Sequence, residues 1–293
     1  MRKLSTRPQR TLARTVTVRG IGYLTGKDIT VQMRPAPVNT GIVFVRTDLS
    51  PRISLSAVVD RVTGTNRRTT LGHPPFTVAL VEHAMSALAG LRIDNCYLNI
   101  DGPELPGLDG SSQDYVDALH NAGVELQSAT KDIVTVPEPV IVRRGGATLS
   151  FYPAEELELR ITYVLNYGQG NPLTPQRHTQ DINPESFGQQ IAGARTFLLE
   201  EEALELKRQG LGKRSSLSDL LVFGQCGVID NTLRFADEPA RHKLLDILGD
   251  LSLSGMDFRG HIIGYRSGHP LNVELVREIQ KRYTVKQPQR MAA

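Results

Sequence analysis

Cysteine is scarce in this sequence, which has only Cys96 and Cys226 among its 293 residues. The two are far apart in the chain, and neither belongs to a C-x-x-C pair. This scarcity argues against a disulfide framework and against a thiolate metal site, and it suits a reducing compartment. Apolar runs of about 18 residues are also missing, and the N-terminus lacks the apolar segment of a signal peptide. We therefore expect a soluble, cytoplasmic protein.

Common catalytic and nucleotide-binding signatures are absent as well. The sequence contains no G-x-S-x-G and no H-E-x-x-H, and Ala79 occupies the position at which H-x-x-E-H would require a histidine before His83. No helical pattern follows the glycine-rich stretch 20–26. Arg214 replaces the serine or threonine that a phosphate-binding loop places after Gly212-Lys213. Catalytic chemistry, if present, must use another arrangement of residues.

Neither sign of charge is in large excess. The formal net charge is +3, and the apolar and charged fractions of 40% and 22% are ordinary for a globular protein. This composition argues against a dedicated nucleic-acid-binding protein. Basic residues do gather before the first acidic residue, Asp28: Arg2, Lys3, Arg7, Arg10, Arg14, Arg19 and Lys27. This basic segment either meets an anionic ligand or a membrane surface, or is simply solvated.

Strand and helix patterns occur in the same order in both halves of the sequence. β-rich runs come first, then a helix, a glycine, a strand and a second helix, although no residue-level repeat is evident. The helices are expected at 77–90, 111–121, 184–192, 200–209, 239–253 and 271–282. We predict an α+β fold made of two layers with related topology. The polar stretch 127–131 sets the expected boundary, which gives domains of residues 1–128 and 129–293.

His242 and Asp246 lie four residues apart in the helix expected after Asp237-Glu238-Pro239. This spacing puts both side chains on one face, where an imidazole and a carboxylate can ligate one zinc ion together with a third protein ligand. Asp250 extends the same stripe, and Gly249 leaves room for another group to approach. Apolar residues cover the opposite side, so an ordinary amphipathic helix with a solvated polar face explains the same pattern.

Two other segments favour the metal interpretation. Glu82 and His83 interrupt an otherwise apolar segment, where a carboxylate needs compensation. The stretch Arg266-Ser267-Gly268-His269 follows a predicted strand, and functional side chains often collect at such strand ends. With the helix above, these segments predict an amide-cleaving metal site that leaves one coordination position open.

The roles follow from the chemistry of each side chain. His83, His242 and Asp246 would hold the metal. Glu82 would accept a proton from water, and His269 would donate one to the departing amine. Asp250 would hold the other ring nitrogen of His269, and Lys243 would offer a positive charge to an anionic group.

Many separated motifs occur in a fixed order along the chain: Gln9-Arg10-Thr11-Leu12, Arg34-Pro35-Ala36-Pro37, Asn39-Thr40-Gly41, Val81-Glu82-His83, Ala87 to Asn95, Pro103-Glu104-Leu105-Pro106, Asp109-Gly110-Ser111, Ala194-Arg195-Thr196-Phe197, Leu233 to Lys243 and Ser267 to Asn272. With these motifs, the sequence resembles the UDP-3-O-acyl-N-acetylglucosamine deacetylase family, the zinc amidases that commit a precursor to lipid A. The resemblance extends from about Gln9 to Leu275.

The resemblance implies the same metal ligands, with Glu82 as general base and His269 as general acid. It further implies that Thr196 helps stabilise the oxyanion, that Asp250 orients His269, and that Lys243, Phe197 and Arg266 line the nucleotide-sugar site. The implied metal is Zn²⁺, although Fe²⁺ suits the same ligands.

The implied fold has two βα sandwich domains packed face to face, with the active site between them. An insert near 196–216 would form a passage for the acyl chain of the substrate, although its leucines are equally explained by packing within their own domain. The implied partner is a UDP-linked acylated amino sugar, with transient proximity to the membrane surface. Neither nucleic acid nor an obligate protein partner is implied.

The sequence departs from the family pattern at two places near the expected site. Leu24 stands where the family usually has histidine, and the loop Lys213-Arg214-Ser215-Ser216 is bulkier than the usual Lys-Gly-Gly-Ser. Two alternatives to the deacetylase therefore remain: a related zinc amidase with an altered substrate, and a non-catalytic relative retained as a binding protein. The second is disfavoured because every proposed ligand, base and acid is present.

Overall fold

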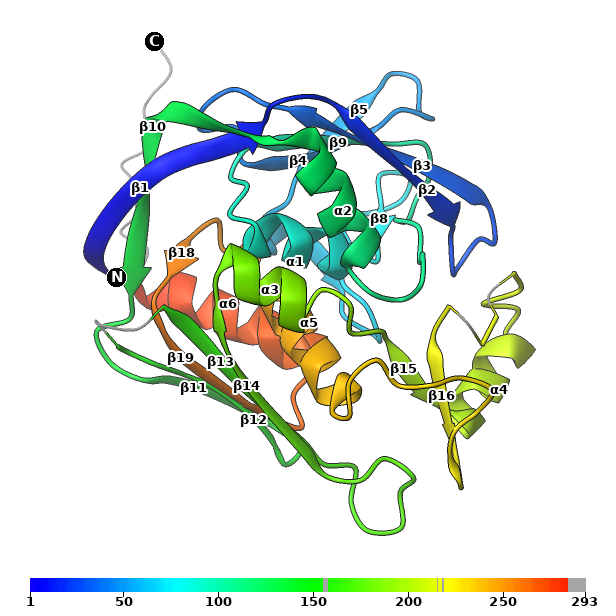
Figure 1. Ribbon diagram of the computed structural model, residues 1–293. Coiled ribbons are helices and arrows are strands. Elements are labelled where there is room, and N and C mark those ends of the chain that lie inside the picture. The colour runs from blue at the N-terminus through cyan, green and yellow to red at the C-terminus, as the bar shows by residue number, and fades with distance from the viewer. Residues whose placement is uncertain (155–157, 215, 218, 284–293) are drawn as a thin grey trace.

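The computed structural model describes residues 1–154, 158–214, 216–217 and 219–283 (Figure 1). Ser215 of the loop singled out above and the polar tail 284–293 lie outside these ranges. Within them, two β-sheets enclose a set of helices, and a smaller group of elements projects to one side (Figure 1). The predicted α+β class is confirmed. Every helix in the described ranges is too short or too polar to cross a lipid bilayer.

The first half of the chain contributes a sheet in which five strands are described. Their spatial order is β2 (Val16–Ile21), β3 (Asp28–Pro35), β9 (Cys96–Ile100), β4 (Ile42–Arg46) and β5 (Ile53–Ser56). The β9–β4 pair is parallel, and the other neighbouring pairs are antiparallel. Val31 and Met33 on β3 are buried whereas Gln32 between them is exposed. This alternation is typical of a sheet with one covered face.

The second half repeats this arrangement strand for strand. The spatial order of its described strands is β11 (Val140–Arg144), β12 (Ala147–Tyr152), β19 (Gly260–Tyr265), β13 (Leu159–Leu165) and β14 (Gln176–Ile182). Here the β19–β13 pair is the parallel one. The predicted relation between the topologies of the two layers is therefore present, although the sequence shows it only as an order of elements.

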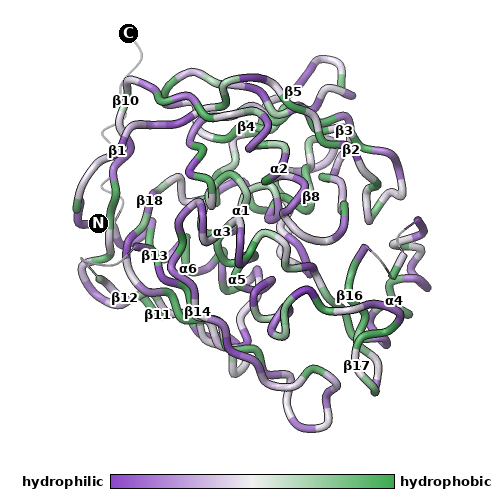
Figure 2. Tube along the Cα trace, in the orientation of Figure 1, coloured by the Kyte–Doolittle hydropathy of each residue, from purple (hydrophilic) through white to green (hydrophobic). Residues whose placement is uncertain are grey.

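Helices fill the space between the two sheets. In each half, one helix precedes the central strand and another follows it: α1 (Glu82–Gly90) and α2 (Gln113–Ala122) in the first half, α5 (Glu238–Ser252) and α6 (His269–Tyr283) in the second. α1 packs against α5 at the centre of the molecule (Figure 1), and apolar residues concentrate there and on the facing strands (Figure 2). The short helix α3 (Pro184–Gln190) inserts Phe187 beside Gly90 at the end of α1.

Four of these helices begin at residues other than those expected, and two of the differences, in α1 and α6, bear on the site. The sequence predicts a start at Thr77 for the first helix, but 78–79 form strand β8 (Val78–Ala79), and Leu80 has a φ of 60° that a right-handed helix cannot include. α1 therefore begins at Glu82. The last helix begins at His269, two residues earlier than expected. Both Glu82 and His269 are thus the first residues of helices.

A third sheet joins the two halves. The N-terminal strand β1 (Arg2–Leu12) pairs with β10 (Val124–Thr135), and the short β18 (Asp257–Phe258) extends this sheet. The boundary expected between residues 128 and 129 falls within β10, so a paired strand rather than a free linker connects the halves. The boundary itself stays a prediction. Arg7 of the basic segment is largely buried and is bonded to Asp94 and Asp257 at 2.7 and 2.5 Å, so this member has a structural role.

The two halves differ in the connection between the last strand of the sheet and the central helix. In the first half it contains a 3-10 turn (Val59–Arg61), β6 (Val62–Gly64), β7 (Thr70–Leu71) and β8. In the second half, after α3, it contains β15 (Phe197–Leu199), α4 (Glu200–Arg208), β16 (Leu221–Gly224) and β17 (Gly227–Val228). The second set is the projecting group in Figure 1, and its described residues cover most of the range 196–216, where the insert stays a prediction. We call these segments the first and second connections.

Candidate metal centre and catalytic site

The close contact between α1 and α5 depends on Gly249. A Cβ atom at this position of α5 would lie 2.2 Å from the carbonyl oxygen of Glu82. Only glycine therefore allows the backbones to approach this closely. The room that the sequence predicts beside Gly249 is filled by the first turn of α1. This contact places the chemistry of the first half against that of the second.

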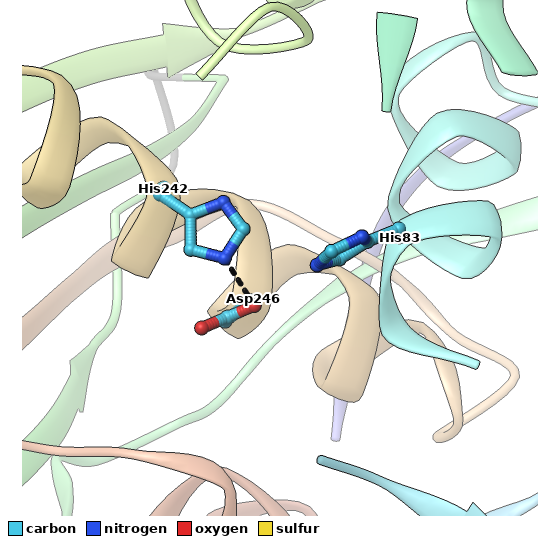
Figure 3. Close-up of side chains that lie close together, drawn as sticks. All are labelled: His83, His242 and Asp246. Carbon is cyan, nitrogen blue, oxygen red and sulfur yellow. Dashed lines mark ion pairs between the residues drawn. The ribbon is translucent and has the colours of Figure 1, made fainter. Parts of the chain in front are cut away.

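The three predicted metal ligands meet at this contact (Figure 3). His83 comes from α1, and His242 and Asp246 come from successive turns of α5. Their ligand atoms lie within 4.8 Å of one another, and the residues are only 7%, 2% and 2% exposed. The two imidazole rings meet edge to face, with their centroids 5.1 Å apart. The helix contact thus creates a buried cluster of two histidines and one carboxylate.

The atoms that face each other in this cluster lack hydrogen-bond donors. His242 Nδ1 lies 3.0 Å from the carbonyl oxygen of Ala194, which can only accept, so Nδ1 carries the proton and Nε2 of the neutral ring carries a lone pair. Asp246 Oδ1 is buried without a hydrogen-bond partner among the described residues and lies 3.5 Å from that nitrogen. Two facing lone pairs require a positive charge near them. These residues therefore fit a divalent cation held by nitrogen and oxygen ligands.

Burial and neighbouring charges favour the protonation states that bind metals. Burial lowers the pKa of His83 to about 3, and it also lowers the pKa of His242. Burial alone would raise the pKa of Asp246, but the positive charge of Lys243 beside it prevails and holds that pKa well below its usual range. Lys243 Nζ donates to Asp246 Oδ2 at 2.9 Å. Neutral imidazoles and an ionised carboxylate are the forms that ligate a metal ion.

Glu82 and His269 border the cluster. His269 Nε2 lies 3.9 Å from Glu82 Oε1 and 3.9 Å from Asp246 Oδ2. On its other side, Nδ1 of His269 lies 2.8 Å from Oδ2 of the fully buried Asp250. Burial raises the pKa of Glu82 to about 7. Burial opposes the charged form of His269, but the carboxylates of Asp250 and Asp246 prevail and raise its pKa to about 9. A carboxyl group poised near neutrality beside a protonated imidazole suits acid–base catalysis.

A buried ion pair holds α5 in place relative to the segment before the second connection. Arg195 donates to the two carboxylate oxygens of Glu238 at 2.8 and 3.2 Å, and Glu238 is fully buried. Because Glu238 is the first residue of α5, this pair fixes the adjacent Ala194 carbonyl opposite His242. The pair therefore helps to determine which nitrogen of His242 faces Asp246.

Thr196 and Phe197 follow this ion pair and lie beside the cluster. The backbone N–H of Thr196 donates to the carbonyl oxygen of Gly110 at 2.7 Å, and its side chain lines the same cavity as the metal-type cluster. The ring of Phe197 lies 5.5 Å from Lys243 Nζ, within the range of a cation–π contact. Thr196 thus lines the cavity, whereas Phe197 is buried against Lys243 and His242, and the predicted roles of both residues stay predictions.

A cavity of about 340 Å³ leads from the cluster into the second connection. Its polar end contains the three ligand residues with Glu82 and His269. Its far end is lined by apolar side chains: Leu198, Leu204, Leu206, Leu211, Leu217, Leu220, Val222 and Ile229. α4 contains no fully buried residue and packs against β15 and β16, and its leucines Leu204 and Leu206 also line one wall of this cavity.

A second cavity, of about 480 Å³, adjoins the first at Lys243. Arg144 and Arg266 line it together with Tyr163 and Tyr167. Its cationic and aromatic lining suits an anionic ligand that carries a ring. Arg266, predicted to contact substrate, is exposed in this cavity.

All residues predicted for the site lie in the cluster, contact it or line one of these two cavities. Their catalytic and binding roles stay predictions. The sequence reasoning missed Thr69 and Asn272, which both bond to Asp250, and Arg68, which lines the first cavity with a buried Nε that has no partner in the described ranges. Asn272 could have been found, because it lies one helical turn after His269. Thr69 carries no periodic signal.

A buried cluster of two histidines and an aspartate, with a carboxylate and an imidazole beside it, is the arrangement expected of a metal-dependent hydrolase. Residues 9–281 match the family described as UDP-3-O-acyl N-acetylglycosamine deacetylase. The chain thus belongs to the UDP-3-O-acyl-N-acetylglucosamine deacetylase family, as its motifs predict.

Individual relatives carry the same description. The UDP-3-O-acyl-N-acetylglucosamine deacetylase of Chlamydia abortus is 41% identical over 93% of this chain and 97% of its own length. Those of Geobacter sp. (strain M21) and Myxococcus xanthus are 40% and 38% identical, over 94% and 92% of this chain and 89% and 86% of their own lengths. The similarity therefore covers both halves and both connections.

Proposed function

We propose that this chain hydrolyses the N-acetyl group of UDP-3-O-acyl-N-acetylglucosamine and releases acetate, a step of lipid A biosynthesis. One observation carries the proposal. A buried metal-type cluster, an acid–base pair and an apolar cavity meet where α1 contacts α5. The family and its curated relatives supply the identity of the substrate.

His83, His242 and Asp246 are the proposed ligands of a zinc ion, and Fe²⁺ suits the same set. When bound, such a cation polarises the amide carbonyl and makes water a stronger acid. Lys243 neutralises the second oxygen of Asp246, which leaves the first oxygen for the metal.

Glu82 is the proposed general base. It accepts a proton from the attacking water, whose oxygen forms a bond to the acetyl carbonyl carbon. His269 then donates a proton from Nε2 to the amide nitrogen as the carbon–nitrogen bond breaks. The products are acetate and the free amine of the sugar. Asp250 supports this exchange because it holds Nδ1–H of His269 and favours the protonated ring.

In this proposal, each of the two cavities holds a different part of the substrate. Thr196 faces the reacting carbonyl as an additional donor to the oxyanion. Lys243, Phe197 and Arg266 contact the nucleotide sugar, with the cations near its diphosphate. The acyl chain occupies the apolar cavity, and extraction of such a substrate brings the protein transiently to the membrane surface.

Two features support the alternative of an altered substrate. Leu24 lines the apolar cavity, and Arg214 donates to Gly26 and Asp28 at 3.1 Å, which ties the second connection to the turn between β2 and β3. These are the two departures from the family pattern. If they change selection of the acyl chain, a substrate with a different chain, or with none, will be turned over faster than the expected one.

Metal analysis combined with an acetate-release assay tests the proposal. We expect the purified protein to bind about one divalent cation per chain, as one three-ligand site requires, and to lose activity on chelation. His83→Ala should abolish both metal binding and acetate release. His120→Ala, which changes an exposed histidine on α2, is the matched control. Acetate release by His83→Ala at the wild-type rate would contradict the assignment.

A further inference from the structure

Thr69 connects groups from both halves of the molecule. It precedes β7 in the first connection, and it is completely buried. Its Oγ1 donates to Oδ1 of Asp250 at 2.5 Å and lies 3.2 Å from Nδ1 of His269. Its backbone N–H donates to Oε2 of Glu82 at 3.0 Å. One residue thus contacts the proposed base, the proposed acid and the carboxylate behind that acid.

The hydroxyl of Thr69 completes the hydrogen bonding of Asp250. Oδ2 of Asp250 receives Nδ1–H of His269 and also Nδ2–H of Asn272, at 2.8 and 2.9 Å. Oδ1 receives the threonine hydroxyl. Without that hydroxyl, one oxygen of a fully buried carboxylate would have no donor in the part of the chain that the structure describes, and the carboxylate would be free to turn away from His269. The hydroxyl therefore fixes the plane of Asp250.

The backbone N–H of Thr69 holds the proposed base, Glu82. Glu82 Oε1 lies 3.9 Å from His269 Nε2, while Oε2 is held by the N–H of Thr69. Because this bond comes from the backbone, it survives any side-chain substitution that leaves the chain path unchanged. The two contacts of Thr69 can therefore be separated by experiment.

We infer that Thr69 is a positioning residue for the hydrolysis proposed above, on which this inference rests. Its hydroxyl sets the orientation of Asp250 and, through it, the direction in which Nε2 of His269 presents its proton. The first connection, which contributes no metal ligand, thereby sets the geometry of the acid on the second half. Misplacement of a proton donor by a fraction of an ångström lowers turnover rather than ground-state binding.

A graded series at position 69 tests this. Thr69→Val keeps the shape and the backbone N–H but removes the hydroxyl, Thr69→Ser keeps the hydroxyl, and Thr69→Cys offers a weaker donor of serine-like shape. We expect Thr69→Val to lower kcat about 10–100-fold, the usual effect of losing such a supporting hydrogen bond, with KM and metal content nearly unchanged. Thr69→Ser should retain most of the activity, and Thr69→Cys should fall between them.

Thr135→Val is the matched control, because Thr135 is equally buried on β10 and its hydroxyl has no partner among the described residues. It should leave kcat unchanged. If Thr69→Val has lost its fold, as judged by Tm against this control, the comparison of Thr69→Ser with Thr69→Cys decides. Equal kcat values for wild type and Thr69→Val, or for Thr69→Ser and Thr69→Cys, would overturn the inference.

A double-mutant cycle tests the route through the acid. If Thr69 acts through His269, Thr69→Val should cost little further activity in a His269→Gln background; a full additional loss would refute that route.

The Nδ1–H proton resonance of His269, identified by its loss in His269→Gln, should shift in Thr69→Val and not in Thr135→Val. This readout does not need turnover. An inactive wild type would refute the proposed function, whereas an unshifted resonance would refute the inference about Thr69.

Discussion

The two halves of the molecule have the same arrangement of strands and central helices, but they contribute different side chains to the site. Each has the same strand order and a helix before its central strand. α1 contributes Glu82 and His83 from its first turn, whereas α5 contributes His242, Asp246 and Asp250 from successive turns of one face. The comparison teaches that a repeated topology brings equivalent helices together at the centre. Sequence differences on those helices then decide which of the proposed metal-binding and acid–base side chains each one contributes.

The two connections differ in the same way. Each leads from the last strand of its sheet to the central helix. The first is compact and delivers Thr69 to the acid–base pair. The second is longer and delivers Thr196, Phe197 and the apolar wall of a cavity. We therefore propose that the first connection positions the acid–base pair and that the second, apart from Thr196, accommodates substrate; the following substitutions test that division.

The largest effect is expected where α1 of the first half contacts α5 of the second half. In Gly249→Ala, the new Cβ would lie 2.2 Å from Glu82 O, so α1 must move away from α5. We expect activity to fall about 10²-fold, because a shift near 1 Å separates Glu82 and His83 from their partners on α5. Unfolding free energy should fall by about 1–3 kcal/mol through overpacking. Acetate release and denaturant titration measure the two effects.

Gly188→Ala on α3 is the control, because nothing lies within 4 Å of the position that its Cβ would take. It should leave activity unchanged and slightly stabilise its helix. Wild-type activity in Gly249→Ala would show that the close contact of α1 and α5 does not set the site geometry.

A smaller effect, on pH dependence, is expected within the second half. Activity requires protonated His269 in our proposal, so it should fall as the pH rises through the pKa of that group, which Asp250 and Asp246 raise against burial to about 9. Asp250→Asn removes one of those charges and lowers the pKa of His269. The alkaline fall in activity should therefore begin at a lower pH than in wild type.

A pH–rate profile of kcat checks this shift. Asp117→Asn, which changes an exposed aspartate on α2, is the control and should not move the profile. An alkaline limb at the same pH in Asp250→Asn and wild type would show that another group controls it.

Much of this arrangement could be predicted because its signals are local. The spacing of His242 and Asp246 follows from helical geometry, and the placement of Glu82 and His83 in an apolar segment indicates a buried cluster. The repeated order of elements predicts two related layers. The contacts of Thr69 could not be predicted, because they join residues that are 181 and 200 positions apart and come from an irregular segment. The predicted start of α1 at Thr77 was wrong, because nothing in the apolar sequence indicates that Leu80 adopts a positive φ.

The smallest effect is expected at the apolar wall of the second connection. Leu198 lines the cavity on β15, and Leu198→Asn places a polar amide where the acyl chain would lie. We expect kcat/KM for the acylated substrate to fall about 10-fold, which corresponds to the transfer free energy of part of one leucine side chain. Turnover of the corresponding substrate without an acyl chain should not change, since the metal cluster and the acid–base pair are untouched. Leu126→Asn, at an exposed leucine of β10, is the matched control. An equal loss with both substrates would mean that the second connection also shapes the catalytic centre, and the division between the two connections would then be wrong.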